Sequence, residues 1–155
     1  MFERFTEEAR RSLFFSRAKT AERLGDAISV EDLLDGIALG GPKAIEMLGD
    51  AASAFRSAES GEQFWVRMEL NRNTTWGEHA RKEIPFSEAT KRVLQFAASE
   101  ADFLLHEAIG PEHLLLGIMR EEGTDASRRL REAGVRLGEL RSVVKNTHRE
   151  RGFAG

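Results

Sequence analysis

The chain has 155 residues, of which 41% are hydrophobic and 32% are charged, and its formal net charge is −3. This composition is typical of a globular protein and excludes a disordered chain. The absence of cysteine excludes disulfides and thiol chemistry and fits a reducing compartment, while the acidic balance argues against a general nucleic-acid binder. No apolar stretch reaches the length of a membrane span, and no signal-peptide pattern is present. We therefore expect a cytoplasmic protein that binds neither membranes nor nucleic acid.

The first two predicted helices begin at hydroxyl residues. Thr6 precedes two glutamates, which is typical of a helix N-cap, and apolar residues follow it at helical spacing as far as Leu24. The second helix is predicted to begin at Ser29, because Ser29 and Asp32 resemble a capping box. Its apolar stripe consists of Leu33, Leu34 and Ile37.

A break at Gly40-Gly41-Pro42 precedes a third predicted helix around Ile45 and a fourth that holds Phe55 and Ala58. The interval that follows is polar but contains Phe64, Val66 and Met68 at alternate positions. This alternation favours a short extended segment laid on the surface, and a prolonged fourth helix is the alternative.

From Phe86 onward the chain repeats itself. The stretch Phe5–Ile37 aligns with Phe86–Ile118 at a constant offset of 81 and without a gap. Ser87 takes the place of Thr6, and Pro111 stands where a first helical turn tolerates proline. Identical pairs include Phe5/Phe86, Glu7/Glu88, Arg11/Arg92, Leu13/Leu94, Phe15/Phe96, Ala27/Ala108, Ile28/Ile109, Glu31/Glu112, Leu33/Leu114, Leu34/Leu115, Gly36/Gly117 and Ile37/Ile118. We predict an all-α bundle of about eight helices, in which two four-helix units bury their apolar stripes together about a pseudo-twofold axis.

The chain lacks the sequence patterns of common catalytic sites. It has no P-loop, no dinucleotide-binding glycine motif and no G-x-S-x-G motif. Its four histidines, His79, His106, His113 and His148, do not form an H-E-x-x-H motif. We therefore predict no catalytic residue, no metal site and no cofactor.

Three segments resemble the Clp N-terminal domain family, a paired-repeat module of AAA+ unfoldases. They are the opening Met1–Arg10, the start of the second copy at Ile84–Ser87, and Ile109–Ile118, which is similar to the family's I-G-T-E-H-I-L-L-G-L signature. The resemblance implies a single domain over residues 1–155, with repeat one at about 1–58, a linker at about 59–83 and repeat two at about 84–148.

The resemblance also implies a function. Family members dock protein substrates or adaptors for a Clp-type AAA+ unfoldase, without catalysis of their own. The chain is then either a free-standing regulator or the N-domain of a longer unfoldase. Some members bind phosphoarginine, with a glutamate on the guanidinium and a hydroxyl residue beside the phosphate. By position this role falls to Glu31 with Thr6 and to Glu112 with Ser87. These four residues can instead act only as helix caps.

The two signatures depart from the family pattern. Asp32 replaces the family's histidine and adds negative charge beside Glu31, which weakens a phosphate site there. Pro111 replaces a threonine, whereas His113 is retained, and we expect His113 to form a structural hydrogen bond. The alternative function is a small-molecule or stress-ligand sensor whose inter-repeat groove is lined by Phe2, Phe5 and Phe86, although aromatic residues at such a position are also ordinary core.

Overall fold

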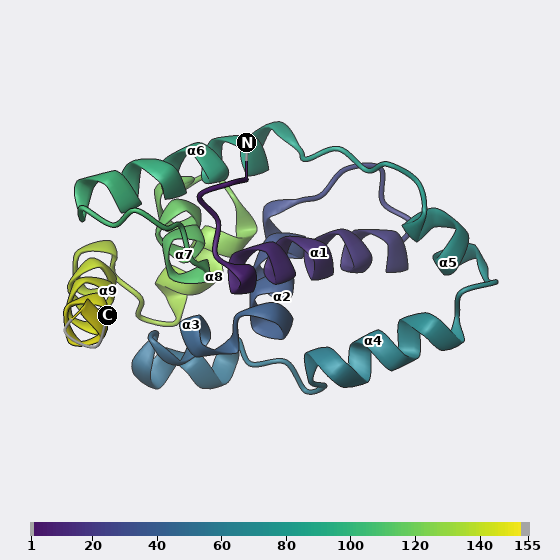
Figure 1. Ribbon diagram of the computed structural model, residues 1–155, viewed down its shortest axis with the longest axis horizontal. Coiled ribbons are helices and arrows are strands. Elements are labelled where there is room, and N and C mark those ends of the chain that lie inside the picture. The colour runs from purple at the N-terminus through teal and green to yellow at the C-terminus, as the bar shows by residue number, and fades with distance from the viewer. Residues whose placement is uncertain (1, 153–155) are drawn as a thin grey trace.

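The computed structural model describes residues 2–152, which form an all-helical protein (Figure 1), as the sequence predicts. The first copy contains α1 (Glu7–Glu22), α2 (Val30–Gly40), α3 (Pro42–Glu46) and the 3-10 helix η1 (Gly49–Ala54). The second copy contains α6 (Glu88–Phe103), α7 (Pro111–Arg120), α8 (Asp125–Glu132) and α9 (Leu137–Gly152). Between them lie α4 (Gly61–Leu70) and α5 (Thr75–Ala80). No helix of the described residues is both long and apolar enough to cross a membrane.

The predicted helix starts are confirmed by their hydrogen bonds. Thr6 Oγ1 accepts from the Ala9 N–H at 3.1 Å, and Ser87 Oγ accepts from the Thr90 N–H at 3.1 Å. Ser29 caps α2 in a capping box, and a proline opens α7. These contacts satisfy backbone donors that the first turn of a helix leaves without intrahelical partners.

The ends of α1 and α6 also match. Leu24 and Leu105 are related by the offset of 81, and both have a left-handed backbone, with φ of 58° and 61°. The N–H of the residue after each leucine donates to a carbonyl in the last helical turn, Gly25 to Thr20 and His106 to Ala101. This is a Schellman motif with leucine in the place usually taken by glycine. The copies therefore share helix ends as well as helix starts.

Equivalent glycines allow the first two helices of each copy to cross closely. A Cβ atom at Gly36 would lie 2.0 Å from Ser16 Oγ, and one at Gly117 would lie 2.5 Å from the Val93 carbonyl. Any larger residue would therefore separate α2 from α1, or α7 from α6.

One large core joins the two copies. Leu33 and Ile37 from the first copy and Leu114 and Ile118 from the second are fully buried in a single cluster. A smaller cluster lies where α4 and α5 cover α1, and it contains Phe15, Phe64 and Trp76 among others. The apolar stripes are thus buried jointly.

The extended segment expected from Phe64, Val66 and Met68 is wrong, because these residues lie in α4, and α5 follows before the second copy begins. Ser60 and Gln63 make a capping box at the start of α4. Phe64 is buried and Met68, one turn later, is half-buried, whereas Val66 points to solvent with 55% of its surface exposed. The fourth helical element of the first copy, η1, ends at Ala54 and is a short 3-10 helix rather than a counterpart of the 16-residue α9.

Candidate functional site

The two copies exchange short backbone contacts where α1 and α6 begin. The Thr6 N–H donates to the Ile109 carbonyl, and the Ser87 N–H donates to the Ile28 carbonyl, both at 3.0 Å. Isolated parallel bridges accompany them, Phe5 with Ile109 and Ile28 with Phe86. Each capping residue therefore lies beside the second helix of the other copy.

A hollow of about 280 Å³ contains both Thr6 and Glu112, and we call it the Thr6–Glu112 hollow. Its walls are formed by Thr6, Glu8, Gly41, Lys43, Ala44, Met47, Pro111, Glu112 and His148. Glu31 is not part of this wall. Thr6 therefore shares a hollow with Glu112 of the second copy, whereas the sequence suggested Thr6 with Glu31 and Ser87 with Glu112.

Groups of both charges surround this hollow. Glu112 is a buried carboxylate, and its Oε2 lies 2.6 Å from Nε2 of His148 on α9. Lys43 is exposed at the start of α3 and adds a positive charge to the wall. The first turn of α1 adds its backbone N–H groups beside Thr6, where the helix dipole favours an anion. The hollow therefore offers a carboxylate for a cation and an N-terminal turn with a lysine for an anion.

His148 belongs to a cluster of three histidines. Its ring stacks on that of His106 with centroids 3.8 Å apart and an interplanar angle of 11°. His106 Nδ1 lies 2.9 Å from His113 Nε2, and the Gly110 N–H donates to His113 Nδ1 at 2.8 Å. His113 thus forms the structural hydrogen bond expected from the sequence.

This hydrogen bond also fixes the protonation of the cluster. Because His113 Nδ1 accepts from a backbone N–H, neutral His113 carries its proton on Nε2 and donates it to His106. Burial is the main cause that lowers the pKa of His113 to about 4. The three rings offer nitrogens within 4.8 Å of one another. However, Nε2 of His113 holds a proton, and the rings of His106 and His148 lie in nearly parallel planes, so one ion cannot lie in the plane of both rings and the geometry is poor for a shared metal ion.

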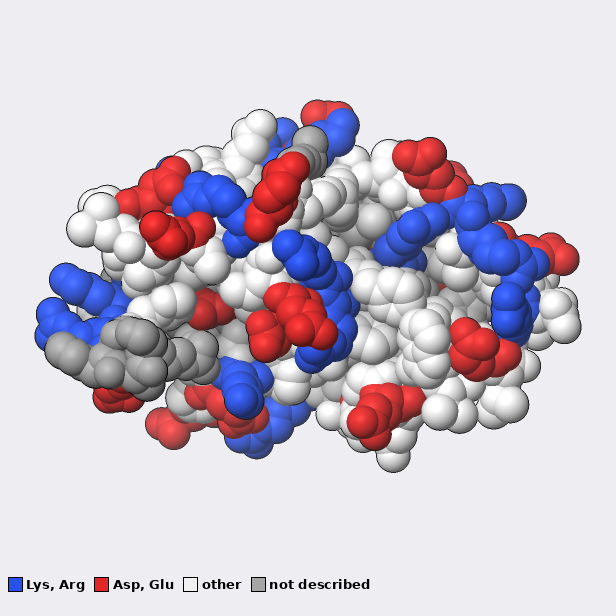
Figure 2. Space-filling model, in the orientation of Figure 1, with Lys and Arg blue, Asp and Glu red and all other residues white. Residues whose placement is uncertain are grey.

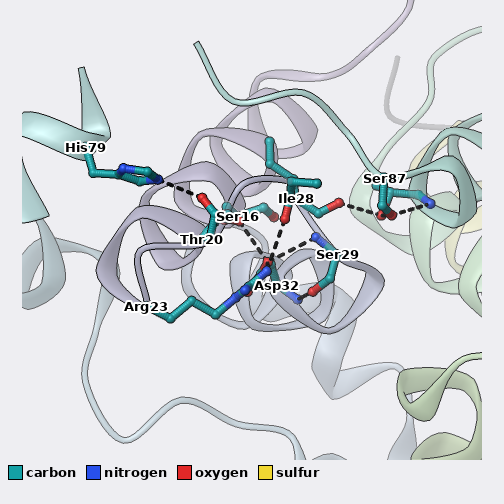
Figure 3. Close-up of polar contacts among 11 residues, drawn as sticks. Ser16, Thr20, Arg23, Ile28, Ser29, Asp32, His79 and Ser87 are labelled. Atoms are coloured by element: carbon teal, nitrogen blue, oxygen red, sulfur yellow. Dashed lines mark hydrogen bonds and ion pairs between the residues drawn. The ribbon is translucent and has the colours of Figure 1, made fainter. Parts of the chain in front are cut away.

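Asp32, the counterpart of His113, is neutralised rather than left as an added charge (Figure 3). Its carboxylate accepts from the Ser29 N–H at 3.0 Å, from Thr20 Oγ1 at 2.8 Å and from Arg23 Nη2 at 2.6 Å. Burial opposes its ionisation most strongly, but hydrogen bonds from Arg23, Ser29 and Thr20 together hold the pKa of Asp32 below its ordinary value. The carboxylate is a structural anchor of α2.

Glu31 and Ser87 also have partners within the protein. Glu31 Oε2 accepts from the Ala126 N–H at 2.9 Å, at the first turn of α8. Ser87 Oγ lies 2.8 Å from Thr90 Oγ1, which itself donates to the Ile28 carbonyl at 2.8 Å. The hydroxyl of Ser87 therefore donates to Thr90 while it also caps α6. Both side chains have structural partners.

The aromatic residues assigned to a groove pack on one another. Phe2 meets Phe5 edge-on at 5.1 Å between ring centroids and Phe86 at 6.3 Å. Phe5 is buried, whereas Phe2 and Phe86 are half-buried against the core. Their rings pack at the junction of the two copies.

Lys43 and His148 line the Thr6–Glu112 hollow but are not among the site residues predicted from the sequence. Lys43 follows Pro42 in a short helix, and His148 lies 36 residues beyond Glu112 on the last helix. Neither carries a sequence motif, because their roles depend on how α3 and α9 pack against α7.

Comparison with known proteins places this geometry in a family. Residues 85–150 match the family model described as the Clp repeat (R) N-terminal domain. The chain is 38% identical over 146 residues to an "ATP-dependent Clp protease ATP-binding subunit ClpA homolog" of Cyanidium caldarium, covering 93% of this chain and 16% of that protein. It is 36% identical to "Chaperone protein ClpC2, chloroplastic" of Arabidopsis thaliana, covering 93% of this chain and 14% of that protein. The chain thus spans about a sixth of the length of these relatives.

A solved structure extends the match to the whole fold. The N-terminal domain of the chaperone ClpD from Arabidopsis thaliana superposes with a TM-score of 0.62 at 25% identity, covering 96% of this chain and 99% of that one. The repeat signature, the relatives and the superposition agree with the paired helical copies described above. The chain belongs to the Clp N-terminal domain family.

Proposed function

We propose that this chain is a non-catalytic docking domain that presents protein substrates or adaptors to a Clp-type AAA+ unfoldase. Of the relatives that it resembles, one is named as an ATP-binding subunit of an ATP-dependent Clp protease and another as a chaperone protein, and the chain corresponds to only a small part of each. A cytoplasmic location, which the cysteine-free composition favours, is part of this proposal.

We further propose that the Thr6–Glu112 hollow takes an arginine side chain that carries a phosphate. The observation that supports this assignment is the buried carboxylate of Glu112 in the same hollow as the N-terminal turn of α1. A carboxylate matches a guanidinium in charge and in its two parallel hydrogen bonds. The phosphate would lie beside Thr6, Lys43 and the first amides of α1.

His148 competes with such a ligand, because it already contacts Glu112 at 2.6 Å. A guanidinium that forms two hydrogen bonds to Glu112 would displace the imidazole, and α9 would keep its attachment through Arg141, which binds Glu100 at 2.7 Å. The equivalent residues Glu31 and Ser87 are proposed as the weaker site, because the described pockets include a hollow shared by Thr6 and Glu112 but none shared by Glu31 and Ser87.

Titration calorimetry with free phosphoarginine tests the site. We expect saturable binding by the wild-type chain, loss of binding in Glu112→Ala and a melting temperature close to that of the wild type. Arginine without phosphate is the ligand control, and Glu31→Ala is the matched protein control and should retain most of the binding. Equal binding by wild type and Glu112→Ala would remove the assignment, whereas a large loss of stability in Glu112→Ala would assign Glu112 a structural role.

The docking function itself is tested by isolation from the source cell. The tagged wild-type chain should recover a Clp-type unfoldase, one of its adaptors or arginine-phosphorylated proteins, each identified by mass spectrometry. Absence of all three classes in repeated experiments would contradict the proposal.

A further inference from the structure

An aromatic pair separates two hollows on the face formed by α1, α4 and α5. The rings of Phe14 on α1 and Trp65 on α4 lie 5.5 Å apart and are 42% and 46% exposed. Both residues line a groove of about 1000 Å³ between α1 and α4 and a smaller hollow of about 290 Å³ that extends to α5. Val66 adds a further exposed apolar side chain to the groove. We call this surface the Phe14–Trp65 surface.

The inner side of α4 packs against α1 and α5 through aromatic residues. Phe64 is fully buried, and its ring packs against Phe15 at 5.6 Å and Trp76 at 5.7 Å between centroids. Trp76 also donates from Nε1 to the Ala18 carbonyl at 3.1 Å, which fixes α5 on α1. The helices are thus held by their buried sides, whereas Trp65 and Val66 lie on the exposed part of α4.

The surface carries more positive than negative side chains, although the whole chain is acidic. Its lining contains five arginines (Arg10, Arg11, Arg17, Arg72, Arg81) and three glutamates (Glu7, Glu62, Glu69). The net charge of the chain, by contrast, is −3. Figure 2 shows this face, with blue side chains bordering a pale, hollowed region over α1, α4 and α5.

Two of these arginines lack an acidic partner among the described residues. Arg17 donates to the Lys82 carbonyl, and its buried Nε has no hydrogen-bond partner. Arg81 donates to the Arg72 carbonyl at 2.8 Å. Both residues line the smaller hollow, and within the described part of the chain neither guanidinium group forms an ion pair with a carboxylate, although Glu69 lines the same hollow beside Arg72.

From this arrangement we propose that the Phe14–Trp65 surface binds a peptide segment of a partner protein in which apolar side chains are flanked by aspartate or glutamate. Phe14, Trp65 and Val66 provide the apolar contact, since exposed aromatic residues in a groove are typical anchors of protein interfaces. The arginines select the acidic flanks, because complementary charge determines which partner is accepted. Such peptide binding would be part of the docking function proposed above, on which it rests, but it would occur on a surface separate from Glu112.

Fluorescence anisotropy with three labelled synthetic peptides tests this proposal on the full chain. The peptides share one leucine- and phenylalanine-containing centre of roughly five residues, which spans about 17 Å when extended, and carry acidic, neutral or basic flanks. We expect the acidic peptide to bind at least tenfold more tightly than the basic one and to weaken as salt is raised. An absence of saturable binding, or tighter binding of the basic peptide, would overturn the proposal.

Variants connect the binding to the surface. Trp65→Ala should weaken binding of the acidic peptide about tenfold, and Arg81→Glu should reduce the preference for acidic flanks. Leu70→Ala is a matched control, because Leu70 lies on the same helix and is 81% exposed but lines neither hollow. Unchanged affinity in Trp65→Ala would refute the site. Self-association that Trp65→Ala abolishes, without peptide binding, would identify a second copy as the occupant and equally refute it.

Glu112→Ala separates this inference from the phosphoarginine site. Peptide binding should be within about twofold of wild type in Glu112→Ala, because Glu112 lies outside both hollows of the Phe14–Trp65 surface. Loss of peptide binding in this variant would show that the peptide occupies the Thr6–Glu112 hollow and would overturn the assignment.

Discussion

Asp32 and His113 hold equivalent positions in the two copies, and each accepts a hydrogen bond from the backbone N–H three residues before it. The distances are 3.0 Å from Ser29 to Asp32 and 2.8 Å from Gly110 to His113. One acceptor is a carboxylate balanced by Arg23, and the other is a neutral imidazole in a buried cluster. The same backbone geometry is thus supported by two chemistries with different responses to pH and to substitution.

The response of His113 to pH is the first prediction. The pKa of this imidazole falls from 6.5 to about 4 on folding, mainly because of burial. Between these values the unfolded chain binds more protons than the folded chain, so stability rises with pH there and is lost as the pH falls from about 6.5 to about 4. His113→Asn keeps an acceptor for Gly110 and removes the titrating group, so its stability should depend less on pH in this window.

Urea denaturation at a series of pH values measures this effect. A reduced rather than abolished slope is expected in His113→Asn, because burial also lowers the pKa of His106. A slope equal to that of the wild type would show that other groups cause the acid sensitivity.

The network around Asp32 gives the second prediction. Asp32→Ala leaves the Ser29 N–H without its acceptor and Arg23 without its anion, whereas the Thr20 hydroxyl keeps the Ser16 carbonyl as an acceptor. We expect the free energy of unfolding to fall by about 3 kcal/mol, as is usual when one partner of a buried charged network is removed. Asp102→Ala is the control, because its ion pair with Arg4 is exposed and should contribute less than about 1 kcal/mol. Equal effects in the two variants would contradict this account.

The third prediction concerns the contact between Glu31 and α8. Glu31→Ala removes the acceptor of the Ala126 N–H, and loss of such an N-terminal contact costs about 1 kcal/mol. Glu31→Gln keeps an oxygen at this position and should recover part of the stability. Amide hydrogen exchange at Ala126 provides the local measurement and should accelerate in Glu31→Ala. Unchanged exchange would argue that this hydrogen bond contributes little.

The fourth prediction concerns Leu105, which follows α6 and has a left-handed backbone conformation. Leu105 has φ of 61° and is 90% exposed, so its side chain contributes little packing while its backbone is strained. Leu105→Gly should raise the free energy of unfolding by roughly 0.5–1 kcal/mol, because glycine adopts this conformation without strain and recovers more than its entropic cost. Thermal melts compare it with Leu70→Gly, which places glycine at a helical position and should be destabilising. Destabilisation by both substitutions would disprove the explanation.

Helix starts and the joint core were predictable because their signals are local. Thr6, Ser29 and Ser87 each stand before an apolar pattern of helical period, and the structure uses all three as caps. Around Phe64 and Met68 the sequence pattern is ambiguous. Apolar residues at alternate positions over five residues fit a strand, but the first and last of them, four residues apart, also fit the buried face of a helix. The capping box at Ser60 and Gln63 was the signal that could have decided for a helix.

The partners within the site could not be predicted from local patterns. The alignment of the two copies shows that Thr6 corresponds to Ser87 and Glu31 to Glu112. It does not show which of these hydroxyl residues lies close to which glutamate in the folded protein. The meeting of Thr6 with Glu112 follows from backbone contacts between the copies. The neutralisation of Asp32 similarly depends on Arg23, which has no charged counterpart at Leu104 in the second copy.

The reciprocal bridges, Phe5 with Ile109 and Ile28 with Phe86, have the form of an isologous interface between two identical subunits. In a polypeptide with a single copy, each bridging residue would lack its partner, and one side of the common core would be exposed to solvent. The ancestor of this domain, before its gene was duplicated, would therefore have folded as a homodimer. Fusion of two such subunits into one chain lets equivalent positions carry different residues, as Asp32 and His113 do.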